Sequence, residues 1–192
     1  MRILLALTLI MVTTSVVIAG PARTPTPAPK SAAPPSPTAA ALSRLSGQDF
    51  DVAFMRELIP INEEAVEIVN SATLYADHPV LLQWNQRLID RKASQVNEML
   101  SILKQLNVTP GRRMVTVVSE PVKQMRSLRG AALEKVYIPL MVAHLGRSME
   151  LGKLAITKSS RPEIRTLAEG LVKAEGQEVV MLRGWMTTWY PK

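Results

Sequence analysis

The sequence predicts an all-α protein, an antiparallel four-helix bundle built from two helical hairpin repeats and preceded by a disordered linker. Three observations support this prediction. Apolar residues recur every three to four positions beyond residue 47, which is the period of one buried helix face. Prolines and glycines interrupt this pattern at the expected turns. The second half of the folded region repeats the plan of the first.

The first twenty residues are organised like a secretory signal peptide. Arg2 precedes a mostly apolar stretch over residues 3–18, and small residues at Val17 and Ala19 predict cleavage after Ala19. We therefore expect a periplasmic or secreted protein. An uncleaved N-terminal membrane anchor is the alternative, but hydroxyl residues interrupt the apolar stretch, which falls short of the ~20 residues of a spanning helix.

Residues 21–46 form the predicted linker. The stretch 21–41 contains seven prolines and no large apolar side chain. Such a composition cannot bury a core and favours an extended, disordered spacer. The folded domain is therefore predicted at 47–192, with hairpin repeats at 49–107 and 122–190 and a connection at 108–121.

The first hairpin begins with a helix that carries one apolar stripe. The stripe consists of Phe54, Leu58, Ile61, Ala65, Ile68, Ala72 and Tyr75. This helix should end near Ala76, because Pro79 is suited to the first turn of the next helix. The second helix continues the same period through Leu81, Trp84, Leu88 and Ile102.

The second hairpin follows the same plan. A shift of 83 residues places Pro79 on Pro162 and aligns the apolar stripes of the two hairpins. Two similar hairpins joined by a longer connection pack most simply as an antiparallel four-helix bundle. Pro60 and Pro139 fall inside the first helix of each hairpin, where each either kinks the helix or marks a later start.

Charge and cysteine content restrict the classes of function. The chain has no cysteine, which excludes disulfides, thiolate metal sites and a catalytic thiol. Acidic residues dominate between positions 49 and 77, and basic residues between 104 and 135. These charges favour association, within one molecule or between two. We expect an anionic envelope component or a second copy as the partner, and no nucleic acid, because no aromatic stripe accompanies the basic residues.

His144 lies in the apolar run of the second hairpin. In an antiparallel hairpin it should share a layer with Glu178 of the last helix. The corresponding layer of the first hairpin contains Arg91 and Gln95. One interpretation is therefore a buried polar pair, in which His144 donates to Glu178 while Glu178 also pairs with Arg91 or Gln95. Such a pair needs no cofactor.

The other interpretation is a soft-metal site. Met141 lies one helical turn before His144, and Met181 follows Glu178 on the inward face of the last helix. Thioether and imidazole groups suit Cu(I) better than a hard cation, although methionines at helical spacing are more often core residues. The candidate metal ligands are Met141, His144, Glu178 and Met181, and copper is the cofactor that they imply.

Catalytic motifs are absent from the sequence. It contains no nucleophile elbow, no glycine-rich phosphate loop and no zinc-protease motif. No glutamate stands three residues before His78 or His144, which excludes the Glu-x-x-His motifs of di-iron bundles. His78 precedes Pro79 and is expected at the surface or at a helix start. We therefore expect a protein that is not an enzyme.

Two adjoining segments, "YIPLMVAHLGRSMELGKLA" and "RPEIRTLAEGLVKAEGQEVVMLRGWMTTWY", resemble the secreted bacterial domain of unknown function numbered 305. The resemblance implies a ferritin-like fold of two-helix repeats and, for some members, copper handling in the cell envelope. His144, Glu178 and Trp185 match the family signature. Leu145, Leu151 and Leu182 stand where the second histidine and two methionines of that signature are expected.

These features together predict an exported helical-bundle module of the bacterial cell envelope that binds or interacts without catalysis. The alternative is a periplasmic metal-binding protein of copper homeostasis that uses a Met/His site. Stoichiometric metal uptake separates the two.

Overall fold

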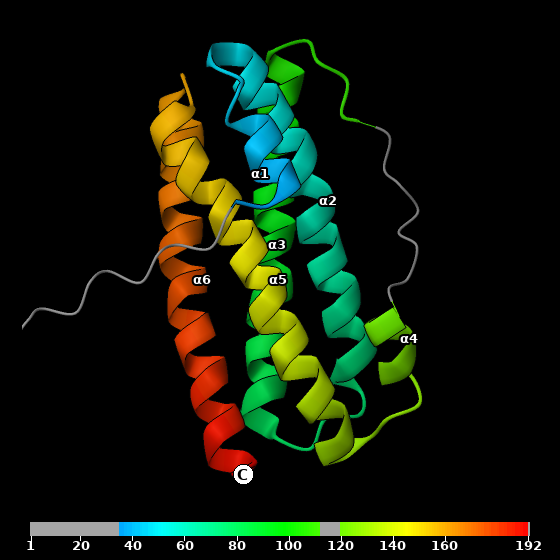
Figure 1. Ribbon diagram of the computed structural model, residues 1–192. Helices are drawn as coiled ribbons and strands as arrows, with labels where there is room; N and C mark the ends of the chain where they lie inside the picture. Colours follow the sequence, from blue (N-terminus) through cyan, green and yellow to red (C-terminus); the bar gives the residue numbers. More distant parts are fainter. Residues whose placement is uncertain (1–34, 112–119, 192) are drawn as a thin grey trace, which may run out of the picture. The chain divides into compact units, whose positions relative to one another are not determined.

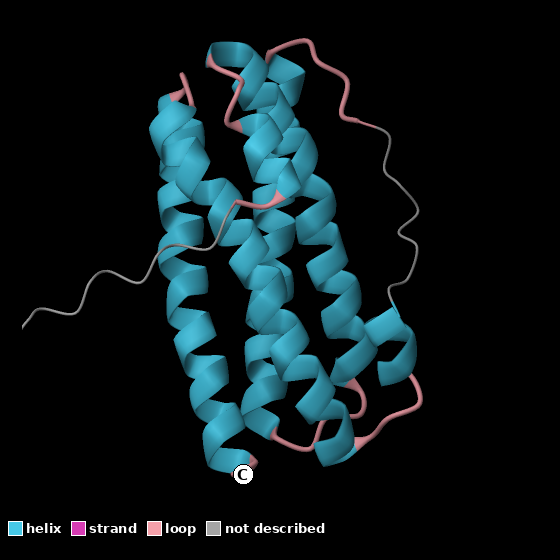
Figure 2. Ribbon diagram, viewed as in Figure 1, coloured by secondary structure: helices cyan, strands magenta, loops and turns pink. Residues whose placement is uncertain are grey.

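The computed structural model describes residues 35–111 and 120–191, and every regular element in these ranges is a helix (Figure 1, Figure 2). The helices are α1 (Pro37–Leu42), α2 (Gly47–Thr73), α3 (Pro79–Gln105), α4 (Glu120–Met125), α5 (Gly130–Lys158) and α6 (Pro162–Trp189). The predicted all-α fold is confirmed. The predicted signal peptide, most of the predicted linker and the greater part of the 108–121 connection lie outside the described residues.

The four long helices α2, α3, α5 and α6 form the bundle. Short turns join α2 to α3 and α5 to α6 as antiparallel hairpins, and α5 starts at the end of the bundle opposite to the one where α3 stops (Figure 1). Helix α2 packs against α3 and α5, and α5 packs closely along α6. The backbones of α3 and α6 approach each other less closely. Long side chains therefore have room to meet between α3 and α6.

Prolines occupy two kinds of position in the bundle. Pro79 and Pro162 stand in the first turns of α3 and α6, where a missing backbone N–H costs nothing. Pro60 and Pro139 lie inside α2 and α5, so neither marks a later helix start. Both of these internal prolines are exposed, and neither ring takes a place in the core.

Helix α1 corrects the predicted linker. The composition predicts disorder as far as residue 46, whereas Pro37–Leu42 is helical, and the Ser36 hydroxyl caps it by accepting from the Ala39 backbone N–H at 3.2 Å. Ala39 and Leu42 are only 2% and 4% exposed. Because these two apolar residues lie on one helix face and reach the bundle, the segment is ordered despite its composition.

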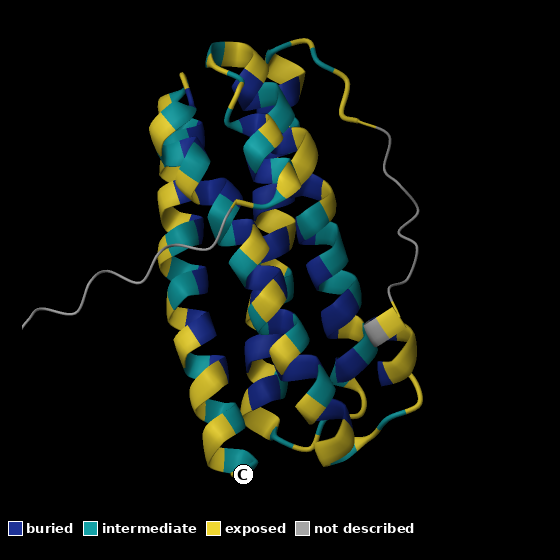
Figure 3. Cartoon of the chain, viewed as in Figure 1, coloured by how far each residue is buried: buried dark blue, intermediate teal, exposed yellow. Residues whose placement is uncertain are grey.

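The long helices are amphipathic, with buried residues on their inner faces and exposed residues on their outer faces (Figure 3). Among the helices described, none has an apolar stretch long enough to span a membrane. Each long helix is held in the bundle by the face that it buries.

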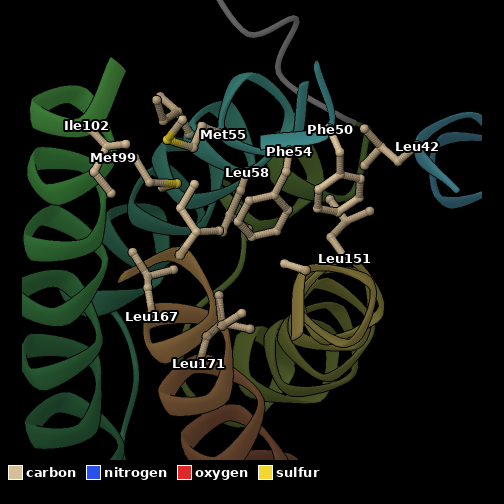
Figure 4. Packing of buried hydrophobic residues seen from close by; sticks show 14 of the residues in the cluster. Leu42, Phe50, Phe54, Met55, Leu58, Met99, Ile102, Leu151, Leu167 and Leu171 are labelled. Atoms are coloured by element: carbon tan, nitrogen blue, oxygen red, sulfur yellow. The ribbon is translucent and has the colours of Figure 1, made fainter. Parts of the chain in front are cut away.

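The core consists of two apolar clusters with polar residues between them. The cluster next to α1 includes Phe50, Phe54, Leu58 and Leu171 (Figure 4). The cluster at the opposite end includes Trp84, Tyr137, Met141 and Leu182. The polar layer between them comprises the buried residues Asn62, Lys92, Gln95, His144, Ser148, Glu175 and Glu178.

Candidate functional site

A salt bridge between Lys92 of α3 and Glu175 of α6 lies at the centre of the polar layer. Lys92 Nζ is 2.5 Å from Glu175 Oε1, and both side chains are fully buried. Lys92 also donates to Asn62 Oδ1 of α2 at 2.9 Å. Ser148 of α5 donates to Glu175 Oε1 at 3.2 Å. Each long helix thus contributes one side chain to a single connected group.

Burial is the dominant influence on this ion pair. It lowers the pKa of Lys92 and raises the pKa of Glu175, while the direct contact between the two groups opposes both shifts. The Asn62 amide extends the group by donating to Gln95 Oε1 at 3.1 Å. A buried ion pair of this kind adds little net stability to the fold. It does destabilise any alternative alignment of α3 against α6 that would leave one of the two charges buried without its partner.

Glu178 forms a second polar link between α6 and α3. Its Oε1 accepts from Trp84 Nε1 at 3.0 Å, and its Oε2 accepts from Arg91 Nη2 at 2.7 Å. The predicted pairing of Glu178 with Arg91 is therefore present. The predicted hydrogen bond from His144 is absent, and the hydrogen bonds that Glu178 accepts come from side chains of α3.

His144 is fully buried on α5. Its Nδ1 lies 3.1 Å from Arg147 Nη2 and 3.7 Å from Glu64 Oε2 of α2. Its Nε2 has no hydrogen-bond partner within the described part of the chain. Burial, followed by the charges of Lys92 and Arg147, lowers the pKa of His144 to about 3. The imidazole is therefore neutral at pH 7.

The two methionines of the candidate metal site lie at the apolar cluster that contains Tyr137. Met141 is fully buried, and Met181 is half-buried against the same cluster. Met141 and His144 thus lie on one face of α5, as predicted, whereas Glu178 forms its hydrogen bonds with side chains of α3. Over residues 35–111 and 120–191, no three His, Asp or Glu side chains are grouped to hold a metal ion. The set Met141, His144, Glu178 and Met181 stays a prediction.

Sequence reasoning missed the central ion pair, although a signal for it was present. Lys92 lies four residues after Leu88, and Glu175 lies four residues after Leu171. Both charges therefore occupy positions on the apolar stripes of their helices. Opposite charges at stripe positions of two helices indicate a buried ion pair, because a lone charge there would be strongly destabilising.

A second polar cluster lies at the end of the bundle where α5 begins and α6 ends. Glu134 of α5 is fully buried and accepts from His78 Nδ1 and from the Tyr190 hydroxyl, each at 2.6 Å. It also accepts from the backbone N–H groups of Asp77 and His78, at 2.6 and 2.9 Å. Burial alone would raise the pKa of Glu134, but these hydrogen bonds outweigh it and hold that pKa below its ordinary value.

His78 is the N-cap residue of α3, so the predicted helix-start position is confirmed. Its ring stacks on Trp189, with ring centroids 3.7 Å apart. The sequence contained no local signal for its bond to Glu134, which is 56 residues away in the chain. This cluster fastens the α2–α3 turn to the start of α5 and to the end of α6.

The fold and these two clusters define a class of protein, a four-helix bundle of two hairpins whose interior polar groups are linked across helices. Within that class the chain belongs to the family described as Domain of unknown function (DUF305), whose sequence profile matches residues 20–103 and 134–192. The family resemblance seen in the sequence is confirmed. A comparison with functionally curated proteins gave no match.

Solved structures share this fold. CopM in its Cu(I)-bound form is 18% identical, with a TM-score of 0.66 over 73% of this chain and 97% of CopM. A DUF305 protein from Streptomyces coelicolor is 18% identical, with a TM-score of 0.65 over 72% and 93% of the two chains. A DUF305 fragment from Deinococcus radiodurans is 18% identical, with a TM-score of 0.64 over 81% and 99%. At this identity the similarity establishes the fold.

Proposed function

We propose that the protein is an exported, non-catalytic helical-bundle module of the bacterial cell envelope that acts by binding a partner on its surface. The observation that carries this proposal is the closed polar layer. His144, Lys92 and Glu175, the groups of the layer best suited to proton transfer, are fully buried. Lys92 and Glu175 are also bonded across helices. What the protein offers to a partner therefore lies on its outer faces.

The outer faces carry both signs of charge. Helix α2 presents acidic side chains at Asp49, Glu57, Glu64 and Glu67. Two basic residues meet this helix within the same molecule, Arg147 at 3.3 Å from Glu64 and Arg126 at 4.0 Å from Glu67. Exposed pairs of this kind contribute little stability. The full chain has a formal net charge of +7, and loss of Arg2 with the signal peptide leaves +6, which favours an anionic partner.

Export is supported by the signal-peptide pattern of the first twenty residues. The relative from Streptomyces coelicolor is also described as a secreted protein. The partner that we propose is an anionic component of the envelope. Self-association is the alternative, and nucleic acid is not proposed as a partner.

Binding to vesicles tests this function. The mature chain, starting at Gly20, is sedimented with vesicles of phosphatidylglycerol or phosphatidylcholine at low and high salt. We expect binding to the anionic vesicles that weakens as salt screens the charges. Sedimentation equilibrium measures self-association in parallel. Substrate turnover that is lost in His144→Ala would contradict a non-catalytic function.

A periplasmic role in copper homeostasis is the second candidate. It is supported by the relative CopM, which was obtained in Cu(I)-bound, Cu(II)-bound and Ag-bound forms. In this chain the buried residues Met141 and His144 lie one turn apart on α5. The ligand set for this candidate is Met141, His144, Glu178 and Met181.

Two positive charges near His144 oppose a copper ion at this residue. Burial, and then the charges of Lys92 and Arg147, disfavour a positive charge on this imidazole and lower its pKa, although the Glu64 carboxylate lies 3.7 Å from Nδ1. The same repulsion acts on a metal cation bound to the ring. We therefore expect the wild type to lose a 1:1 competition with a Cu(I) chelator. One Cu(I) per chain, abolished by Met141→Leu, would favour the copper candidate instead.

A further inference from the structure

Exposed apolar side chains gather at the turn that joins α2 to α3. Of the four large apolar side chains that are exposed in the described residues, Leu74, Tyr75 and Val80 lie in or beside this turn. Leu74 is 79% exposed and protrudes from the turn. Single exposed apolar residues are common on protein surfaces. Three of them at one turn form a patch, and such patches mark interaction sites.

The turn is fastened to the start of α5, so the patch has a fixed shape. The Tyr75 carbonyl oxygen accepts from the Gly130 backbone N–H at 2.7 Å. Gly130 has a φ of +53°, and a Cβ atom there would collide with the Asp77 side chain. Two backbone N–H groups of the turn also donate to Glu134. Because Leu74 extends from a braced turn, little further ordering is needed when it binds.

Basic side chains accompany the patch. The Arg129 guanidinium lies over the Tyr75 ring, 3.5 Å from its centroid. The Lys135 ammonium lies 5.0 Å from the centroid of the Tyr190 ring. Arg126 is exposed in the segment between α4 and α5. The surface that these groups form, which we call the tip surface, consists of Leu74, Tyr75, Val80, Arg126, Arg129 and Lys135.

Positive charge prevails at this end of the bundle. Within about two and a half helical turns of the end, the exposed basic residues are Arg87, Lys123, Arg126, Arg129, Lys135 and Arg183, and the acidic residues are Glu67, Asp77, Glu120 and Glu134. Glu134 is fully buried, and Glu120 is paired with a lysine of α4. Glu67 lies 4.0 Å from Arg126. The cations that remain outnumber Asp77, so the tip surface attracts anions.

Aromatic rings border the same end. Trp185 and Trp189 are half-buried and stack on each other, with ring centroids 5.1 Å apart. Tyr190 follows them and is also half-buried. The α2–α3 turn, the start of α5 and the end of α6 lie together at this end (Figure 1). Tryptophan and tyrosine concentrate at membrane–water interfaces, where the ring meets lipid and its polar atom stays in water.

We propose that the tip surface docks the protein on an anionic phospholipid bilayer, with Leu74 inserted at the headgroup boundary and the basic side chains at the lipid phosphates. Apolar area leaves water on docking, and an anionic membrane attracts each nearby cation. A bilayer also deforms around a protruding side chain, whereas a protein partner has to offer a matching hollow. This docking site rests on the proposed function, and it specifies the anionic partner as a lipid membrane.

The depth of residue 74 in a bilayer tests the docking. The chain contains no cysteine, so one introduced thiol can carry an environment-sensitive NBD label. Leu74→Cys is labelled in the mature chain, and Val180→Cys, at a position 73% exposed on α6, is the matched control. With phosphatidylglycerol vesicles, the label at position 74 should shift its emission to the blue and be quenched by nitroxide-labelled lipid. The label at position 180 should show neither change.

Removal of the apolar contact is the second measurement. Leu74→Ser should weaken binding to phosphatidylglycerol vesicles by about tenfold, because less apolar area leaves water. Val180→Ser should leave the binding unchanged. Both positions are exposed, and circular dichroism checks that the two variants are folded.

Removal of charge is the third measurement. Arg126→Gln with Lys135→Gln should weaken binding to the same vesicles by about tenfold or more. Lys104→Gln with Lys153→Gln removes the same charge from exposed positions toward the other ends of α3 and α5. Salt screens charges that are far from the membrane, so this control should weaken binding by less than about threefold.

Two results overturn the docking site but not the proposed function. One is vesicle binding that both charge variants weaken equally while the label at position 74 stays in water, because another face then binds the anion. The other is binding to soluble poly(glycerol phosphate) without binding to vesicles, because the partner is then a phosphate polymer and not a bilayer. Binding to neither probe overturns both proposals.

Discussion

His144 is neutral in the folded protein, because burial and the cations Lys92 and Arg147 lower its pKa from 6.5 to about 3. The unfolded chain binds a proton at this residue below pH 6.5, and the folded chain does not. The stability that this group contributes is therefore present above pH 6.5 and is lost as the pH falls toward 3. We expect the free energy of unfolding, measured by urea titration, to fall by up to about 1.4 kcal/mol per pH unit across this window.

The control for this pH dependence is His144→Leu, since other groups also titrate in acid. The raised pKa of Glu175 and the lowered pKa of Glu134 act with opposite signs, and both remain in the variant. The difference between wild type and variant thus isolates the histidine. Equal slopes in the two proteins would show that His144 is not the group responsible.

At pH 7 the same variant tests the partner of His144. Among the residues that the structure describes, none is a hydrogen-bond partner of His144 Nε2, and Glu178 keeps its bonds to Trp84 and Arg91. We therefore expect His144→Leu to change the free energy of unfolding by less than about 1 kcal/mol. Adding Glu178→Leu should lower stability further, because it leaves Arg91 unpaired. If the double variant were instead more stable than His144→Leu alone, the result would support the predicted pair of His144 and Glu178.

The central ion pair makes a different prediction. Lys92→Met leaves the Glu175 carboxylate buried without a counter-charge and should lower the free energy of unfolding by about 3–5 kcal/mol. The double variant Lys92→Met with Glu175→Leu removes both charges and should recover most of that loss. Urea denaturation of the two single variants and the double variant completes the cycle. Additive losses would mean that the two charges are not coupled.

At the scale of the elements, α5 and α6 pack closely because Gly152 has no side chain. A Cβ atom there would lie 2.8 Å from Val172 Cγ2 and 3.0 Å from Leu171 Cδ2. We expect Gly152→Ala to lower the free energy of unfolding by about 1–3 kcal/mol. The matched control is Gly170→Ala on α6, where a Cβ meets no atom within 4 Å, and which should stabilise by about 0.5–1 kcal/mol. The same sign for both variants would contradict this packing.

The end cluster around Glu134 connects three elements and should respond as a unit. Glu134→Ala removes the acceptor of His78, Tyr190 and two backbone N–H groups. We expect a loss of about 2–3 kcal/mol and faster hydrogen exchange at the start of α3 and the end of α6. Glu120→Ala breaks an exposed pair with Lys123 and should change stability by less than about 0.5 kcal/mol. Unchanged exchange in Glu134→Ala would argue against the connection.

At the scale of the whole molecule, the position where the folded domain begins can be tested by truncation. Chains that start at residues 20, 35 and 44 differ first by proline-rich sequence and then by α1. The first deletion should leave the thermal midpoint unchanged. The second exposes the apolar surface that Ala39 and Leu42 cover, and it should cost about 1–3 kcal/mol. An equal thermal midpoint for all three chains would support the predicted end of the linker at residue 46.

Much of the architecture could be derived from the sequence alone. Most of the stripe of α2, the prolines that open α3 and α6, and the repeat of the hairpin are local patterns, and each acts through the helix period or through the missing backbone N–H of proline. Two predicted stripe residues are not buried: Ile61 is half-buried, and Tyr75, which follows the end of α2, is exposed. The family was also recognisable, since its sequence profile covers most of the folded domain. The polar character of the central layer followed from His144 and Glu178, which interrupt apolar stripes.

The tertiary structure alone decided which polar groups meet. Lys92 and Glu175 are 83 residues apart, and Glu178 reaches Trp84 and Arg91 over a similar separation. A period of 3.6 residues gives the face of each helix but not its rotation or axial register against three neighbours. A difference of one turn moves a side chain by about 5 Å, which is more than the length of a hydrogen bond. His144 therefore lies in the predicted layer and yet has Arg147, and not Glu178, as its neighbour.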